Sequence, residues 1–546
     1  MTLNLHRYHR YILIDLTVFI VCLLFSGWLM VHTFSYRDGT LIMASKVWSD
    51  FAAHLPLIRS FSVGDNFPPE YPTFPGEPIR YHYLFYLVVG LIEKTGLNLA
   101  LSLNLVSILG FGLLLWMIYK TTILFFSSRK AGLIAIILFL FNGSFSFIEY
   151  FHKFGFSLQS FLDIPKLEHF VTFGPWDGKV VSAFWNLNIY TNQRHLGLSF
   201  GLALVVLYPF IKVLCRRLPT PKWWYPGLAV IMLLMPILHQ AAFLMVWLVA
   251  VGITFLDLRQ IKRYFPLVFA LAAGSIPGIL AAPVVSSQNI VFQIGFLSNT
   301  ARALPLLKYW LYNIGLYLPL IPILLVWLKR PGKIFLLSLL PLFILANLFR
   351  LSPDMINNHK LVNFFLIGLT ILTAGFIQKL WRKSLLTAII AICLMIGLTY
   401  SGIIDFFPIY NDYYSELPDI PRAVTATWIR DHTPPKSVFL TTTYLYNPAS
   451  LAGRKTFEDY GYFNWSMGYN DSVRREELSY LFSRELPRAS ICRHLIDNRI
   501  DYVIISPGRG DLGILDPQQS TLVTTLKPTY QSSEGYSIYD VSQNCH

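Results

Sequence analysis

The chain has 546 residues, of which 54% are hydrophobic and only 14% are charged, and its formal net charge is +14. A soluble protein of this length needs more charge to cover its surface, so the composition predicts a polytopic membrane protein. The basic residues stand in short clusters between apolar runs, as in membrane proteins, and this pattern excludes a nucleic-acid-binding protein.

The first apolar run extends from Tyr11 to His32. It is too long for the core of a signal peptide and predicts a retained membrane helix. The aromatic run at 81–96 is too short for a full crossing and predicts a re-entrant or half helix. Further runs near the roughly 20 residues that a bilayer requires lie at 101–119, 131–150, 196–214, 224–238, 241–257, 264–284, 309–328, 334–349, 361–379 and 385–404.

The basic clusters predict how these helices are oriented. Pairs such as Arg129 with Lys130 and Arg216 with Arg217 come between apolar runs. If every cluster is cytoplasmic, the chain makes about eleven full crossings, with its N-terminus in the cytoplasm and its C-terminus outside. The long loops, among them 33–82, then all face outside. A full crossing at 81–96 would instead move Arg129 and Lys130 outside, unless a second crossing compensates.

The composition becomes polar after the last apolar run. The stretches "RAVTATWIRDHT" and "DSVRREELSYLFSRE" are typical of helices, whereas "SVFLTTT" and "RIDYVIISP" are typical of strands. Helices alternating with strands predict one α/β domain over residues 407–546, outside the membrane, beside a membrane domain over residues 1–406. Cys492 and Cys545 could form a disulfide if both are external.

The stretch "WSDFAAHLPLIRSF" (48–61) is the most informative part of the loop 33–82. Its apolar residues recur at helical spacing and predict a helix that lies in the membrane interface. Asp50 and His54 stand one turn apart on another face. An alternative is that Asp50 forms an ordinary interfacial salt bridge with Lys46 or Arg59.

Other ionisable residues fall at the same depth, where polar groups are costly and tend to mark functional sites. Arg194 and His195 precede the span at 196–214, His239 lies between two spans, and His359 and Lys360 precede the span at 361–379. For His239 the alternative is a core histidine with satisfied hydrogen bonds. No glycine-rich loop follows a strand and opens a helix, so a nucleotide site is not supported, and the sequence contains no HExxH motif.

The order of these features resembles the GT-C membrane glycosyltransferases that use polyprenyl-phosphate sugars, including the protein O-mannosyltransferase and aminoarabinose-transferase types. The resemblance is carried by "SDFAAHLPLIRSF", by the proline-aromatic stretch with "YHYLFYLVVGLIEKTGLN" after it, and by the outer segment "NPASLAGRKTFEDYGYFNWSMGYN". It is specific over about residues 45–100 and is closest to bacterial members of unknown substrate.

The resemblance implies that Asp50 is the catalytic base, with His54 as its partner. Relatives often carry a second acidic residue beside the first, but here its neighbours are Ser49 and Phe51. No cofactor is therefore expected; a divalent cation is possible but has no support in the sequence. The phosphate of the donor needs cationic and hydrogen-bonding groups, and the candidates are Arg59, Arg80, Tyr81, His82, Arg194, His195, His239, His359 and Lys360.

These features predict a polytopic α-helical glycosyltransferase that moves a sugar from a lipid-phosphate donor to a lipid, glycan or protein acceptor on the outer face, with inversion. Two alternatives stay open. A flippase for lipid-linked saccharides would share a polar cavity but has less need of a large outer domain. A non-catalytic scaffold would use the outer domain to bind polysaccharide or protein partners.

Overall fold

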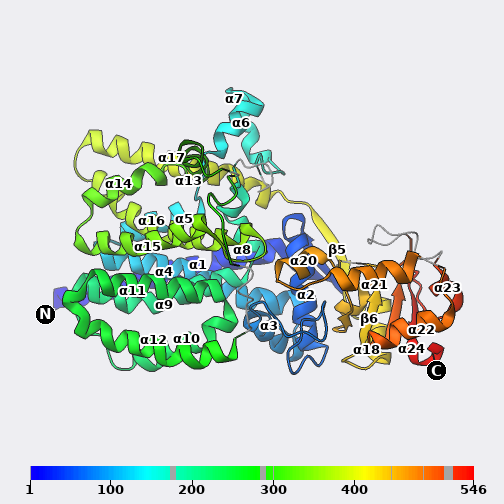
Figure 1. Ribbon diagram of the computed structural model, residues 1–546. Helices are drawn as coiled ribbons and strands as arrows, with labels where there is room; N and C mark the ends of the chain where they lie inside the picture. Colours follow the sequence, from blue (N-terminus) through cyan, green and yellow to red (C-terminus); the bar gives the residue numbers. More distant parts are fainter. Residues whose placement is uncertain are drawn as a thin grey trace.

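The computed structural model describes residues 2–172, 180–282, 290–298, 300–443, 445–483, 485–508 and 520–545. Figure 1 shows a bundle of long helices on the left and an α/β domain on the right, with the N-terminus at the far end of the bundle. Within the described residues, seven helices are long and apolar enough to cross a membrane. They belong to α1 (Thr2–Thr33), α4 (Leu99–Phe126), α9 (His195–Arg216), α12 (Ile261–Ala281), α15 (Arg330–Leu348), α16 (His359–Leu380) and α17 (Leu385–Tyr410).

The prediction of one continuous span at 131–150 is wrong. The chain forms α5 (Arg129–Leu140) and, after a break, α6 (Ser146–Phe154), followed by α7 (Leu158–Asp163). Contacts with distant parts of the chain account for the break: the Asn142 amide donates to the carbonyl of Trp185 at 2.8 Å, and a Cβ on Gly143 would lie only 3.2 Å from Cβ of Ser401.

The expected span at 309–328 is also not straight. Helices α13 (Ala303–Ile314) and α14 (Tyr317–Trp327) meet at 90°, at Gly315 with φ +56°. The runs at 224–238 and 241–257 form α10 (Trp224–Leu238) and α11 (Gln240–Leu256), separated by His239, while the aromatic run at 81–96 forms the short α3 (Leu84–Lys94). The total of about eleven crossings stays a prediction.

Glycines allow the central pair of helices, α4 and α9, to approach closely. A Cβ on Gly110 would lie 2.8 Å from the backbone nitrogen of Leu198, and one on Gly197 would lie 3.0 Å from Cα of Phe111. In a membrane the hydrophobic effect does not hold helices together, and small residues instead allow close packing between their backbones. The close pair gives α9 a fixed position from which its first residue, His195, projects into the protein interior.

Basic residues gather at the end of the bundle that holds the N-terminus. Arg129 binds Asp15 at 2.7 Å, which joins α5 to α1. Arg216, at the end of α9, donates to the hydroxyl of Ser127 at 2.7 Å. The clusters predicted from the sequence therefore lie together at the opposite end from the α/β domain (Figure 1).

The α/β domain contains the four predicted elements, as α18 (Val424–His432), β6 (Val438–Thr441), α21 (Ser472–Ser483) and β8 (Tyr502–Ile505). Its sheet has the strand order β7-β6-β8-β10-β9. Strand β6 is parallel to β7 (Lys455–Thr456) and β8, whereas β10 (Ser537–Asp540) is antiparallel to β8 and β9 (Tyr530–Gln531). Helices α22 (Arg488–Asp497), α23 (Thr521–Thr525) and α24 (Val541–Cys545) complete it.

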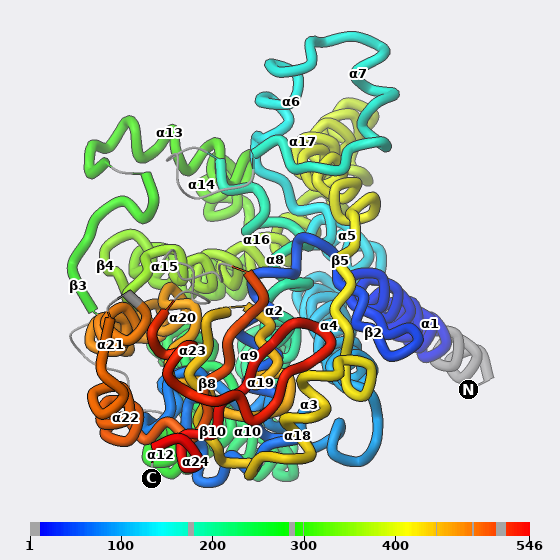
Figure 2. The backbone as a smooth tube through the Cα atoms, turned by 90° about the vertical axis from the view of Figure 1, so that its right-hand side faces the viewer, coloured from blue at the N-terminus to red at the C-terminus, as the bar shows by residue number. Residues whose placement is uncertain are grey.

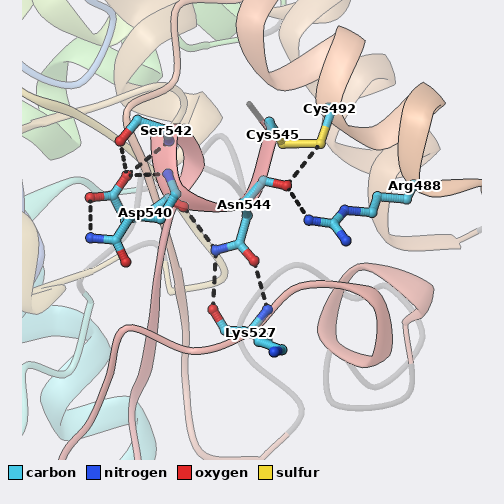
Figure 3. Close-up of a disulfide and its surroundings, with 8 residues drawn as sticks. Arg488, Cys492, Lys527, Asp540, Ser542, Asn544 and Cys545 are labelled. Carbon is cyan, nitrogen blue, oxygen red and sulfur yellow. Dashed lines mark hydrogen bonds between the residues drawn. A yellow bond between two sulfur atoms is a disulfide. The ribbon is translucent and has the colours of Figure 1, made fainter.

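The disulfide that the sequence left open is present between Cys492 in α22 and Cys545 in α24. Figure 3 shows its surroundings: the Asn544 carbonyl accepts from Arg488 at 2.6 Å, and the Asn544 side chain bonds to the backbone of Lys527. These contacts tie the chain end to the domain.

Helix α2 (Trp48–Ser62) lies between the bundle and the α/β domain. The prediction that it lies in the membrane interface is wrong, because every residue from Phe51 to Ser62 is buried by protein. Its end meets the α/β domain backbone to backbone: Gly453 has φ +76°, and a Cβ there would lie 2.5 Å from the nitrogen of Gly64. Above it, β2 (Thr40–Ala44) pairs with β1 (Phe34–Arg37) and with β5 (Tyr414–Pro418) from the link that follows α17. Helix α17 continues to Tyr410, past the expected boundary at 407.

Candidate functional site

Two neighbouring cavities lie where α2, α16 and the α/β domain meet. The first, called the Asp50 cavity, has about 390 Å³ and is lined by Asp50, His54 and His359 among others. The second, called the Lys360 cavity, has about 250 Å³ and is lined by Lys360 and by further polar residues. The two share the wall residues Tyr81, Asn357, Ser466 and Met467. Three more of the residues that the sequence predicted to bind phosphate, Arg80, His82 and His239, also line the Lys360 cavity.

Asp50 is a carboxylate with an unusual environment. It is half-buried, and it faces the Asp50 cavity. Burial raises the pKa of Asp50 to about 6, while the positive charge of Lys360 acts in the opposite direction. Among the described residues, its carboxylate has no hydrogen-bond or ion-pair partner. A carboxylate held without a partner, and with a pKa close to neutrality, can accept a proton from a substrate hydroxyl.

His54 lies on the same wall but does not bond to Asp50 in the described structure. Its ring packs against Tyr86, with 4.8 Å between the ring centroids. Burial, followed by the charges of Arg194 and Lys360, lowers the pKa of His54 to about 3, so the imidazole is neutral at physiological pH. The nearest charge of opposite sign to Asp50 is therefore not His54 but Lys360.

Two cationic residues face the Lys360 cavity. Lys360 is 6% exposed, and its ammonium donates to the amide oxygen of Asn357 at 3.3 Å. Arg80 donates to the carbonyl of Gly468 at 2.6 Å and to Glu77 at 3.0 Å. Lys360 also lies 5.9 Å from the ring centre of Tyr81, which separates the two cavities. Both cations can reach an anion placed in this cavity.

Arg59 and Arg194 line neither cavity, so the prediction that they hold a phosphate loses its support. Arg59 makes a buried ion pair with Asp419 at 2.6 Å and another with Glu93 at 3.2 Å. Arg194 is 2% exposed; it donates to Asn104 and, at 3.0 Å, to the carbonyl of Met30. Both guanidinium groups therefore join chain segments inside the protein, although Nε of Arg59 has no hydrogen-bond partner among the described residues. The alternative pairing of Asp50 with Arg59 or Lys46 is likewise absent, since Lys46 binds Asp412 at 2.7 Å.

Four buried histidines converge near the cavities. One ring nitrogen each of His82, His195 and His239 lies within 4.8 Å of the other two. Within the described part of the chain, the Nε2 atoms of these three and of His359 have no hydrogen-bond partner. The Nδ1 atom of His195 is 2.9 Å from the hydroxyl of Tyr86. Unpaired buried polar atoms are costly, so this group has the character of a binding site for something that pairs with them.

The α/β domain supplies the other side of both cavities. Helix α20 (Gly461–Ser466) contributes Tyr462 and Phe463 to the Asp50 cavity, and Met467 lines both cavities. The Tyr462 hydroxyl donates to Asp354 at 2.7 Å, and Asp354 caps the short helical turn that leads into α16. Figures 1 and 2 show α20 beside the ends of the bundle helices. Sequence reasoning did not identify these residues, because nothing local in "GYFNWSM" indicates contact with a membrane domain.

Comparison with known proteins gives a distant likeness to solved structures, one of which is as follows. No protein-family model and no curated protein sequence matches the chain. The chain is similar to the crystal structure of the Archaeoglobus fulgidus oligosaccharyltransferase tethered to an acceptor peptide, with 13% identity and a TM-score of 0.43 over 97% of this chain and 74% of that one. Similarity at this level assigns neither a family nor an activity.

Proposed function

We propose that the chain is a membrane glycosyltransferase of the GT-C type, which moves a sugar from a polyprenyl-phosphate donor to an acceptor hydroxyl on the outer face of the membrane. The observation that carries the proposal is Asp50: a carboxylate with a raised pKa, open to one cavity, beside a second cavity that contains Arg80 and Lys360. A base next to an anion site is the arrangement that this reaction needs.

The two cavities suit the two substrates. In the proposal, the phosphate of the donor occupies the Lys360 cavity, where Arg80 and Lys360 offset its charge. The sugar extends past Tyr81 toward the Asp50 cavity, where the acceptor binds under helix α20 of the outer domain. The isoprenoid tail leaves the Lys360 cavity past apolar residues such as Leu244 and Leu361.

The chemistry balances with a single base. The acceptor oxygen attacks the anomeric carbon of the sugar while the bond between that carbon and the phosphate oxygen breaks. The hydroxyl proton passes to the carboxylate of Asp50, and the polyprenyl phosphate leaves as an anion stabilised by Lys360 and Arg80. One displacement inverts the anomeric centre and needs no covalent intermediate on the protein.

The proposed location of the site is supported by two independent features. The disulfide between Cys492 and Cys545 is consistent with an oxidising compartment for the outer domain. The basic residues at the opposite end of the bundle, such as Arg129 and Arg216, are consistent with a cytoplasmic position there.

The test uses purified full-length protein in nanodiscs with a panel of radiolabelled polyprenyl-phosphate sugars. We expect at least one donor to release polyprenyl phosphate in the wild type and not in Asp50→Asn. A flippase would instead move intact labelled lipid across proteoliposomes without breaking the sugar–phosphate bond. A scaffold would tolerate alanine at Asp50, Arg80 and Lys360 without any loss of activity in cells.

A further inference from the structure

The tautomer of His239 is fixed by its position in the fold. His239 precedes α11, and its Nδ1 atom accepts the backbone N–H of Ala242 at 3.0 Å, as a helix N-cap. A backbone N–H can only donate, so Nδ1 carries no proton. In a neutral imidazole the proton is then on Nε2, and that N–H group has no partner although it is buried.

The same reasoning applies to His359 through a different neighbour. The Asn363 amide nitrogen donates to the carbonyl of Phe184 at 3.0 Å, which fixes the orientation of this amide. That nitrogen lies 3.1 Å from Nδ1 of His359, so Nδ1 accepts and Nε2 again carries the proton. Two histidines from different helices therefore present N–H groups without partners beside the two cavities.

A fixed tautomer of this kind conflicts with metal binding at Nε2. A metal ion requires the lone pair of Nε2, and the proton then moves to Nδ1. In His239 that proton would face the N–H of Ala242, and the cap of α11 would be lost. Three histidines with ring nitrogens within 4.8 Å of one another have the residue type of a metal site. In His239, however, the Nε2 atom carries a proton and has no lone pair for a metal ion.

An oxygen acceptor fits the same space. One ring nitrogen of each histidine lies within 4.8 Å of the other two, so one oxygen placed between them can lie within hydrogen-bond length of all three. His195 can adapt, because the Tyr86 hydroxyl at its Nδ1 both donates and accepts. Burial lowers the pKa of His82 well below its usual range, so this ring adds a hydrogen bond rather than a charge.

We propose that His82, His195 and His239 together bind a phosphate oxygen of the lipid-linked donor through uncharged N–H groups, and that they do not form a metal site. This inference rests on the proposed function for the identity of the ligand. It assigns different tasks to the two groups of residues: Arg80 and Lys360 supply charge, whereas the histidines orient one oxygen by hydrogen bonds. His82 and His239 line the Lys360 cavity; His195 lines neither cavity, but one of its ring nitrogens lies within 4.8 Å of a ring nitrogen of each of the other two.

Two variants at His239 separate the two tasks of this side chain: the first keeps the helix cap and removes the donor, and the second restores the donor without the cap. In His239→Asn the side-chain oxygen replaces Nδ1 as the acceptor for Ala242, but nothing reaches the position of Nε2. In His239→Gln the amide nitrogen reaches about as far as Nε2 and can donate again. The probes are farnesyl phosphate, with uncharged farnesol as its control, added to protein in nanodiscs and followed by thermal shift and by titration. Zinc and manganese content is measured on the same preparations.

We expect farnesyl phosphate to bind and stabilise the wild type and farnesol to have no such effect. His239→Asn should bind farnesyl phosphate about tenfold more weakly, and His239→Gln should recover most of that loss. About one metal ion per chain that disappears in His239→Asn would overturn the proposal, as would unchanged binding in that variant. If the lipid phosphate binds as expected but no donor sugar is transferred, the proposed function fails and this inference stands.

Discussion

Replacing Asp50 by asparagine separates two effects of this carboxylate: the stability that its burial costs and the catalysis that it would supply. In the unfolded chain this carboxyl has a pKa of 3.8, and burial raises the value to about 6 in the folded protein. Between these pH values the folded protein binds more protons than the unfolded chain, so stability falls as pH rises through this window. A shift of about two pKa units corresponds to about 3 kcal/mol at pH 7. Asparagine keeps the shape and removes this cost.

We therefore expect Asp50→Asn to be more stable than the wild type at pH 7, by up to about 3 kcal/mol, and equally stable near pH 4. Transfer should fall by about 10² to 10⁴, the usual contribution of a general base. The assay is thermal unfolding in nanodiscs at several pH values, together with release of polyprenyl phosphate. Asp65→Asn is the control, because the Asp65 side chain is 58% exposed and far less desolvated. Transfer that survives in Asp50→Asn refutes the assignment of the base, and a loss of stability at pH 7 refutes the electrostatic argument.

Four further outcomes are expected. Transfer by the wild type should decrease as pH falls below about 6, because the carboxylate of Asp50 becomes protonated; a pH–rate profile that is flat between pH 5 and 8 would contradict this. Arg59→Met leaves Asp419 and Glu93 buried without a cation and should cost about 3–5 kcal/mol, measured by thermal unfolding, whereas the conservative Arg59→Lys should cost less. Gly453→Ala should loosen the contact with Gly64 and increase protease cleavage between the bundle and the α/β domain. The control is Gly508→Ala, which should leave that cleavage unchanged, because Gly508 also has positive φ but has open space around it. Reducing the disulfide, which closes a loop of 53 residues, should lower the stability of the α/β domain by about 4 kcal/mol, seen as a lower unfolding midpoint in dithiothreitol.

Sequence reasoning located the helices and strands well where the signal is local. The strands at β6 and β8 and the helices at α18 and α21 follow from alternation and periodicity alone. It failed where a distant contact decides: the break after α5 depends on Trp185 and α17, and the burial of α2 depends on a domain that lies hundreds of residues later in the chain. Amphipathic spacing cannot tell a helix that rests on lipid from one that is enclosed by protein.

The candidate site shows the same division. The residue types could be predicted, and Asp50, Lys360 and His239 face the two cavities. The roles of the arginines could not be predicted, because whether an arginine is free depends on carboxylates such as Asp419 that lie far away in the sequence. The convergence of three histidines from the segment before α3, from α9 and from the α10–α11 junction is a property of helix packing, and no spacing in the sequence encodes it.

The raised pKa of Asp50 gives the outer domain a role in the proposed reaction. Burial is the largest cause of the shift, and part of that burial comes from Tyr460, Tyr462 and Phe463, which lie across the Asp50 cavity from the base. Without this cover, the carboxyl would have more contact with water, its pKa would move toward 3.8, and it would be a weaker base. In the proposed reaction the acceptor binds in the cavity that these residues line, so the segment that contributes to the strength of the base would also contact the acceptor.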